Sequence, residues 1–420
     1  MLSLFSYAKS VKKFCKCALI IFCCAFFNLL KAQQPFRYDN VLYKAVYWND
    51  AIQKMNADKK YLLLDVRTPG EYADTSGMTH LNMGHIKDAV NINIDSFANH
   101  LDELKKHKDE DIFVYCSHSQ RSRRVSKLLA DNGFKNVYNI NGGMSVLNES
   151  SVANVPLKNK ILVNRNAFQH IASADVFNLM QKADVLIIDV RTKTEFDSKD
   201  PDFIKNIGHI KNAINIPAAE FKNKFKELNV PANKTILVYD DIGSKSTDIA
   251  EEVAMMGYKN VYNLFEGLSG FMCDNYLKPA EKNKVIVNPP AFKIIGVRDC
   301  IDILSKQNDF LLLDARPEDE FNSKSSKEYL NDGRIKNAVN VPTVDVLESA
   351  IKNTNKDVNI LVYGSTSGNN DVDVCKALVE KGYTNVYFLY QGIGRFVWSC
   401  FNIENCKDGI SILTNYEGLY

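Results

Sequence analysis

The chain has 420 residues, of which 45% are hydrophobic and 24% are charged, and its formal net charge is +2. This composition is typical of soluble globular proteins and excludes a disordered chain, and the length predicts roughly three domains. The sequence shows neither a basic stripe nor an RNA-binding aromatic pattern, so nucleic acid is not an expected partner.

The first 32 residues have the features of a secretory signal peptide. A cluster of four lysines precedes an apolar run from Ala18 to Leu30, and Ala32 offers a small residue for cleavage. The apolar run is shorter than the roughly 20 residues of a membrane span. We therefore expect residues 1–32 to be a signal peptide and the protein to be secreted or periplasmic. The alternative is that this segment is not cleaved. The protein would then contact a membrane through this segment only.

The next unit, residues 35–152, alternates short apolar runs with amphipathic stretches. Nearly continuous Leu, Ile, Val and Phe predict buried parallel strands at 61–66, 89–94, 112–116 and 136–140. Helical spacing predicts helices at 94–107 and 121–132. The alternation predicts an α/β fold, an open and mainly parallel sheet with helices on both faces. In such sheets, functional groups gather at the carboxyl ends of the strands.

A polar loop follows the third of these strands and carries the candidate nucleophile. It reads Cys116-Ser117-His118-Ser119-Gln120-Arg121-Ser122 and leads into a helix. Backbone N–H groups of such a loop and of the first helical turn converge on the Cys116 sulfur, where they stabilise the nucleophilic thiolate. Arg121 adds a positive charge with donors suited to an oxyanion. The alternative is that Cys116 is a buried structural cysteine.

Three motifs of this unit recur twice with a period of 124 to 125 residues. The first contains Asp65, Arg67 and Glu71 and returns as Asp189, Arg191 and Glu195, and as Asp314, Arg316 and Glu320; the others begin at Gly84 and Asn136. One period shared by three motifs predicts three copies of a whole domain. The predicted bounds are 35–152, 153–278 and 279–406, with a tail at 407–420. The similar segments 160–164 and 284–288 are each expected to form the first strand of the following domain.

Comparison of the three copies distinguishes motifs that occur in every copy from residues that occur in one loop only. The second copy has Asp240 at the position of Cys116, and the third has Gly364, so neither can form a persulfide there. Asp65, Arg67, Glu71 and His85 belong to motifs that persist in the copies without cysteine, so we interpret these four residues as structural. His118 occurs in the first loop alone, where it is either catalytic or a solvent-facing loop residue.

The combined motifs resemble those of the rhodanese family of sulfurtransferases, over essentially the whole chain that follows the signal peptide. The motifs are Asp-x-Arg-x-x-x-Glu, Gly-His-Ile-x-x-Ala-x-Asn-Ile, a strand ending in Cys-x-x-x-x-Arg-Ser, and Gly-Gly. The resemblance implies three tandem domains, with sulfur transfer in the first. The second and third copies would serve as scaffold, docking surface or shield.

The resemblance also implies a persulfide mechanism. Cys116 would take the outer sulfur of a thiosulfate-like anionic donor and pass it to a thiophilic acceptor, such as a thiol or a periplasmic thiol-redox protein. Arg121 would neutralise the donor. Ser122 would cap the helix and donate to the sulfur, and Ser117, His118, Ser119 and Gln120 would present backbone N–H groups. No metal-ligand cluster or dinucleotide fingerprint is recognised in the sequence, so neither a metal nor a cofactor is expected.

Two other functions fit the same residues less well. Cysteine phosphatases and arsenate reductases also combine a thiolate with a downstream arginine, but their loop is typically one residue longer. A non-catalytic binding or redox-sensing module would explain why two of the three loops lack a nucleophile. The sequence leaves open whether Cys400 and Cys406, the closest pair of cysteines after the signal segment, form a disulfide.

Overall fold

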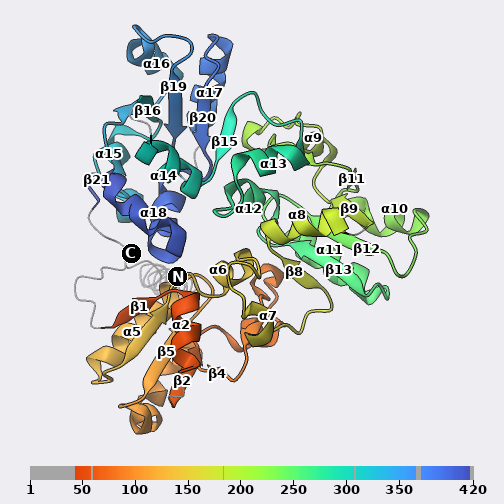
Figure 1. The fold of residues 1–420 in the computed structure, drawn as a ribbon, viewed down its shortest axis with the longest axis vertical. Coiled ribbons are helices and arrows are strands. Elements are labelled where there is room, and N and C mark those ends of the chain that lie inside the picture. Colours follow the sequence, from red (N-terminus) through yellow and green to blue (C-terminus); the bar gives the residue numbers. More distant parts are fainter. Residues whose placement is uncertain (1–42, 58–59, 183, 307–308, 366–369, 417–420) are drawn as a thin grey trace, which may run out of the picture.

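The computed structural model describes residues 43–57, 60–182, 184–306, 309–365 and 370–416. It contains three domains of the same fold arranged around a common centre (Figure 1). The predicted signal peptide lies outside the described residues. None of the described helices combines the length and the hydrophobicity that crossing a bilayer requires.

Domain 1 is built on a five-stranded parallel sheet with the order β1-β6-β5-β2-β4. Its strands are β1 (Lys44–Val46), β2 (Tyr61–Asp65), β4 (Val90–Asn91), β5 (Asp111–Tyr115) and β6 (Val137–Ile140). Its α-helices are α2 (Trp48–Met55), α3 (Pro69–Ala73), α4 (Leu101–Leu104), α5 (Gln120–Asp131) and α6 (Gly143–Glu149). Short 3₁₀ segments are η1 (Thr79–Leu81), η2 (Ile94–His100) and η3 (Lys105–His107).

Domains 2 and 3 repeat this sheet, which confirms the predicted α/β class and the three tandem copies. Domain 2 contains β8 (Gln169–Ile171), β9 (Val185–Asp189), β11 (Ile214–Asn215), β12 (Thr235–Tyr239), β13 (Asn260–Leu264), α8 (Ser173–Lys182), α9 (Lys193–Phe196), η4 (Phe203–Lys205), η5 (Ala218–Glu220), α10 (Phe221–Glu227), α11 (Lys245–Met255) and α12 (Gly267–Cys273). Domain 3 contains β15 (Lys293–Ile295), β16 (Phe310–Asp314), β18 (Val339–Asn340), β19 (Asn359–Tyr363), β20 (Val386–Leu389), α14 (Val297–Lys306), α15 (Glu318–Phe321), η6 (Glu328–Leu330), α16 (Val344–Ile351), α17 (Asn370–Glu380) and α18 (Gly392–Asn402).

Each sheet is apolar on both faces, as the continuous hydrophobic runs predict. Phe113 and Tyr115 of β5 pack into one cluster, whereas Ile112 and Val114 pack into another on the opposite face. The first of these clusters continues into domain 3, where it includes Leu361, and a third cluster joins domains 2 and 3. The three domains therefore share hydrophobic cores.

The segments between domains form strands as we predicted, but they join the preceding domain and not the following one. β7 (Leu162–Val163) and β14 (Ile286–Val287) pair antiparallel with β3 (His85–Ile86) and β10 (His209–Ile210) of the preceding domain. They therefore close the domain before them, and the first strands of domains 2 and 3 are β8 and β15. The similarity of the two segments identified a strand but not its partner.

The C-terminal tail has the same role in domain 3, which the sequence did not reveal. After η7 (Glu404–Ile412), β21 (Leu413–Thr414) pairs antiparallel with β17 (Arg334–Ile335). Each copy thus ends with a strand added to its own Gly-x-Ile motif.

A buried lysine fixes each join between domains. Lys158, on α7 (Lys158–Ile161), donates to the carbonyl oxygens of Asn148 and Ser150 at the end of α6. Lys282, on α13 (Pro279–Val285), repeats this contact with α12 and also pairs with Asp299. Both lysines satisfy the carbonyl groups that a helix leaves unpaired at its C-terminus.

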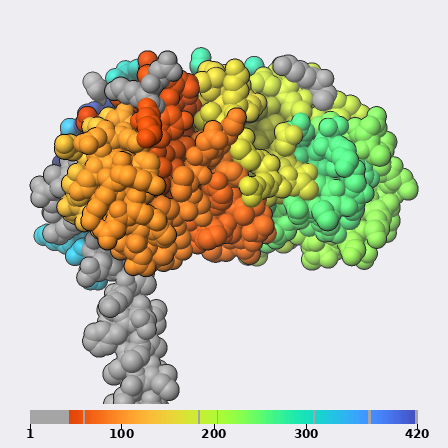
Figure 2. Space-filling model, turned by 90° about the horizontal axis from the view of Figure 1, so that it is seen from below, coloured from red at the N-terminus to blue at the C-terminus, as the bar shows by residue number. Residues whose placement is uncertain are grey.

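Side chains from all three domains meet at the centre of the molecule. Arg395 of α18 pairs with Glu149 of α6 at 2.6 Å, and its Nη2 lies 3.5 Å from a carboxylate oxygen of Glu266. Glu266 precedes α12 and accepts a hydrogen bond from Ser145 Oγ. Domains 1 and 2 also abut at the surface (Figure 2), and Thr79 Oγ1 donates a hydrogen bond to Asp248.

Candidate active site

Cys116 lies directly after β5, a central strand of the domain 1 sheet, and its exposed fraction is 1%. The backbone N–H groups of Met144 and Ser145 donate to the carbonyl oxygens of Cys116 and Ser117, each at 2.9 Å. Ser119 precedes α5 in the left-handed conformation, with φ of 79°. The first turn of α6 therefore holds the loop carbonyls, and the loop then turns sharply into α5.

Gly143 makes this close approach of α6 possible. Its φ is +53°, and a Cβ atom built on it would lie 2.1 Å from the carbonyl oxygen of Cys116. The corresponding glycines, Gly267 and Gly392, approach Asp240 and Gly364 in the same way, with Cβ distances of 2.7 and 2.1 Å. The second glycine of the Gly-Gly motif, which is the one present in all three copies, thus has a steric cause.

We expect Gly143→Ala to destabilise domain 1 by at least about 2 kcal/mol, because it adds a left-handed backbone conformation to a steric clash. Gly77→Ala is the control, because a Cβ there would meet nothing within 4 Å. Thermal unfolding of both variants checks this. A Gly143→Ala protein as stable as Gly77→Ala would contradict the observed packing of α6 on the loop.

Arg121 is held by a residue that we predicted to be structural. Its two terminal nitrogens each donate to one carboxylate oxygen of Glu71 at 2.6 Å, and Nη2 also donates to Ser117 Oγ at 2.9 Å. Thr68 donates to the same carboxylate through its backbone N–H and its hydroxyl. Glu71, which is 2% exposed, is therefore part of the loop structure in domain 1.

The charges of this pair are mutually stabilised. Burial opposes ionisation of Glu71, but hydrogen bonds from Arg121 and from the Thr68 backbone lower its pKa to about 2. Burial likewise opposes the charge on Arg121, but the hydrogen bond to Glu71 and then the electrostatic effect of Cys116 raise its pKa. Arg121 is thus close enough to Cys116 to favour an anion there.

The remaining loop residues do not all lie where we predicted. Ser122 does not cap α5, because Ser119 precedes the helix, and the Ser122 hydroxyl bonds the Ser119 carbonyl at 3.0 Å and Asn139 Oδ1 at 2.7 Å. His118 is half-buried rather than solvent-facing, and its ring centroid lies 6.5 Å from that of Trp398 in domain 3. Burial lowers the pKa of His118. Gln120 is exposed.

In domain 2, a carboxylate occupies the loop in place of the thiol. Asp240 accepts hydrogen bonds from the backbone N–H groups of Gly243, Lys245 and Ser246 and from the Ser246 hydroxyl. These donors correspond to Ser119, Arg121 and Ser122 of domain 1. The repeated loop therefore has the geometry of an anion-binding cradle.

Domain 3 fills the corresponding space from the helix. A Cβ atom built on Gly364 would lie 2.5 Å from a carboxylate oxygen of Asp371, near the start of α17. Burial raises the pKa of Asp371 to about 7. Domain 2 thus has a carboxyl group and domain 3 a helix side chain where domain 1 has the Cys116 thiol.

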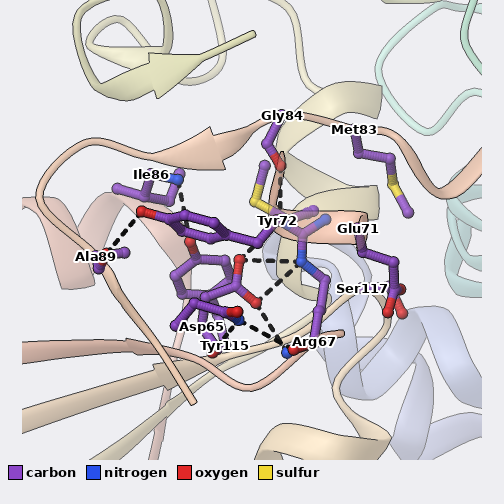
Figure 3. Close-up of polar contacts among 12 residues, drawn as sticks. Asp65, Arg67, Glu71, Tyr72, Met83, Gly84, Ile86, Ala89, Tyr115 and Ser117 are labelled. Atoms are coloured by element: carbon purple, nitrogen blue, oxygen red, sulfur yellow. Dashed lines mark hydrogen bonds and ion pairs between the residues drawn. The ribbon is translucent and has the colours of Figure 1, made fainter. Parts of the chain in front are cut away.

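The Asp-x-Arg motif forms a buried network that is the same in each domain. Arg67 donates to both carboxylate oxygens of Asp65 and to the carbonyl oxygen of Gly84 (Figure 3). Arg191 and Arg316 repeat these contacts with Asp189 and Asp314. His85 is buried and packs its ring 4.2 Å from that of Tyr72. This geometry fits the structural interpretation of Asp65, Arg67 and His85.

The six described cysteines are all free thiols, Cys400 and Cys406 included. Burial raises the pKa of Cys273 and of Cys400 to about 12. It also raises the pKa of Cys300, Cys375 and Cys406. These five thiols are therefore protonated and unreactive at neutral pH.

The Cys116 loop borders two cavities between domains. The first, of about 230 Å³, is lined by His118, Leu81 and Met83 of domain 1, Ile242 and Glu266 of domain 2, and Arg395 of domain 3. The second, of about 530 Å³, lies between domain 3 and the loop residues His118 and Gln120. The contributions of Glu266, Arg395 and Trp398 could not be found in the sequence, because they depend on how the domains pack.

Comparison with known proteins identifies relatives of single domains. The tRNA uridine(34) hydroxylase of Buchnera aphidicola (subsp. Baizongia pistaciae) is 29% identical over 134 residues, which cover 30% of this chain and 40% of that protein. The enzyme of the same name from Yersinia pestis (strain Pestoides F) is 31% identical over 99 residues, with coverages of 23% and 25%. The chain therefore spans less than half the length of these curated relatives.

The chain is also similar to solved structures. A rhodanese-like domain protein from Staphylococcus aureus is 29% identical, with a TM-score of 0.21, over 24% of this chain and 87% of that one. A thiosulfate sulfurtransferase from Pseudomonas aeruginosa is 14% identical, with a TM-score of 0.22, over 82% and 66%. A family model described as Rhodanese-like domain matches residues 49–150, 173–273 and 298–397. These three matches take up most of the chain, which therefore belongs to the sulfurtransferase-like rhodanese family and contains three tandem rhodanese-like domains.

Proposed function

We propose that the protein is a sulfurtransferase whose Cys116 carries sulfur as a persulfide. The observation that carries the proposal is the set of hydrogen bonds to Asp240. In domain 2 these loop donors bind the carboxyl group that follows the strand. The same donors in domain 1 would surround a thiolate or a persulfide on Cys116.

The reaction divides into two displacements at sulfur. The Cys116 thiolate attacks the outer sulfur of a donor such as thiosulfate; a new S–S bond forms, the old one breaks, and sulfite leaves with the electron pair. An acceptor thiolate, or cyanide, then attacks the outer sulfur of the persulfide and regenerates the Cys116 thiolate. The loop donors and Arg121 would stabilise negative charge in both steps.

The first cavity, which His118 of the Cys116 loop lines, would admit a small donor. A volume of about 230 Å³ is below the usual range of about 300–1,000 Å³ for drug-sized ligands. Its walls come from three domains, so the two domains without a nucleophile would contribute to substrate selection. The curated relatives are named for tRNA, but the matches cover at most 40% of the length of those proteins. We therefore propose no tRNA substrate for this chain.

Intact mass spectrometry of the purified protein tests the proposal. Thiosulfate should add one sulfur atom, cyanide should remove it, and Cys116→Ser should not gain it. Cys375→Ser is the matched control, because Cys375 is also buried and free but lies in domain 3, and it should behave as wild type. No sulfur gain by protein with a free Cys116 thiol would count against thiosulfate as donor.

Alkylation gives an independent prediction. Under native conditions near neutral pH, limited iodoacetamide should label Cys116 before the other described cysteines, since burial raises the pKa of those five. Peptide mapping by mass spectrometry measures the order of labelling. Equal or earlier labelling of Cys273 would contradict the assignment of Cys116 as the reactive thiol.

We also propose that residues 1–32 direct export and are removed. The support is the basic, then apolar, then small-residue order of this segment. Fractionation of expressing cells, with N-terminal peptide mapping of the purified chain, tests this. An intact Met1 on cytoplasmic protein would refute it.

A further inference from the structure

The cavity beside domain 3 differs in its charges from the Cys116 loop of domain 1. The second cavity, of about 530 Å³, lies in the usual size range of ligand sites. Two carboxylic acids line it, Glu320 of α15 and Asp332 before β17, with exposed fractions of 9% and 6%. Tyr329 and Trp398 contribute aromatic walls, and His118 and Gln120 of the Cys116 loop complete the enclosure.

Glu320 corresponds to Glu71 of domain 1 but has lost the donors that hold Glu71. In domain 1, Thr68 provides an N–H and a hydroxyl to the glutamate, and Arg121 provides two more donors. Domain 3 has Pro317 in place of Thr68, which has neither group, and its loop from Gly364 to Asn370 contains no Lys or Arg. Accordingly, no described residue bonds Glu320 Oε2, although that atom is buried.

Asp332 adds a second carboxyl group at a position where the other two domains have an apolar residue. The corresponding residues are Met83 in domain 1 and Ile207 in domain 2. Burial raises the pKa of Asp332 to about 6, against the opposing effect of Arg316, and burial also raises the pKa of Glu320. Among the described residues, neither carboxyl group forms an ion pair.

Both arginines that line this cavity are ion-paired with other carboxylates, although Nη1 of Arg316 and Nε of Arg395 have no hydrogen-bond partner among the described residues. Arg316 is bound to Asp314 and to the Gly333 carbonyl, and Arg395 is bound to Glu149. Lys327 lowers the pKa of Glu320 only weakly, and the described structure contains no ion pair between them. The cavity therefore has an excess of negative charge, whereas Arg121 balances Glu71 in domain 1.

We propose that the cavity of domain 3 binds a small organic cation, an ammonium or guanidinium compound, with its charge on Glu320 and Asp332. The hydrogen-bond donors of such a ligand would replace those that Thr68 and Arg121 supply in domain 1. Two carboxyl groups form too small a donor set for a metal ion, and the described residues contain no cluster of three or more metal-ligating side chains. The bound cation would contact His118 and Gln120, and thereby the Cys116 loop.

Saturation-transfer NMR on the full chain tests the site with methylguanidinium, butylammonium and tetramethylammonium as probes. Methylurea and butanol are uncharged counterparts. We expect at least one cation to bind and its uncharged counterpart not to bind. Cys116→Ser should keep this binding, so the result does not depend on sulfur transfer. Binding of none of the three cations at millimolar concentration, or equal binding of cation and counterpart, would overturn the proposal.

Variants locate the binding. Glu320→Gln and Asp332→Met, the latter restoring the domain 1 residue, should each weaken binding at least tenfold. Glu318→Gln, on the exposed side of the same helix, is the matched control and should bind as wild type. Because Glu320→Gln removes an unpartnered buried charge, it should raise the melting temperature of the ligand-free protein. Undiminished binding by both cavity variants would place the cation elsewhere and refute the site.

Discussion

Arg67→Met should lower the free energy of unfolding of domain 1 by about 3–5 kcal/mol, because it leaves the Asp65 carboxylate buried without its partner. Both side chains are fully buried, and Arg67 also bonds the Gly84 carbonyl. Arg191→Met and Arg316→Met should cause losses of similar size in domains 2 and 3. Hydrogen exchange of β2, β9 and β16, followed by mass spectrometry, measures each domain separately.

These three variants also decide whether the motif acts in catalysis. If Arg67 is structural, sulfur uptake per mole of folded protein should fall no further in Arg67→Met than in Arg191→Met. A tenfold larger loss in Arg67→Met, from protein shown to be folded, would instead give Arg67 a role in the reaction. The inactive domains are suitable controls because they repeat the same contacts without a cysteine nearby.

The local sequence was sufficient to predict the strands, helices and loops that depend on neighbouring residues. The apolar run at 61–66 becomes β2 at Tyr61–Asp65, and the helix predicted at 121–132 becomes α5 at Gln120–Asp131. The internal repeats then gave three domains, because several motifs that share one long period indicate that a whole domain is repeated. The loop between β5 and α5 was also predicted, since strand, polar loop and helix are adjacent in the chain.

Contacts between distant segments could not be predicted in this way. Glu71 occurs in every copy, which favoured a structural interpretation, yet only domain 1 has an arginine to pair with it. The strand at Leu162–Val163 was predicted, but its pairing with His85–Ile86 depends on a chain reversal that has no local signal. Packing between domains likewise places Trp398 beside His118. A solvent-facing position was one of our two predictions for His118.

Arg121→Met should destabilise domain 1 by about 3 kcal/mol near neutral pH, because the pKa of Glu71 lies at about 2 in the folded chain against an ordinary value of 4.5. A carboxyl group whose pKa is lowered by folding stabilises the fold at pH values above its pKa in the unfolded chain. This stabilisation is lost as the pH falls toward about 2. The stability difference between wild type and Arg121→Met should therefore narrow between about pH 5 and pH 2.

Pulse labelling of Cys116 in denaturant measures this difference, since Cys116 is the only described cysteine of domain 1. Lys127→Met is the control, because its ion pair with Asp131 is exposed and should contribute less than about 1 kcal/mol. A difference for Arg121→Met that does not change with pH would show that Glu71 is not the titrating partner.

The double variant Glu71→Gln/Arg121→Met separates the two roles of Arg121. It removes both charges together, so most of the lost stability should return. The KM for thiosulfate should stay raised at least tenfold, because the positive charge near Cys116 is still absent. If KM recovers together with stability, then Arg121 acts only by holding Glu71 and Ser117 in place. A raised KM in a stable protein would instead show that its charge binds the anionic donor.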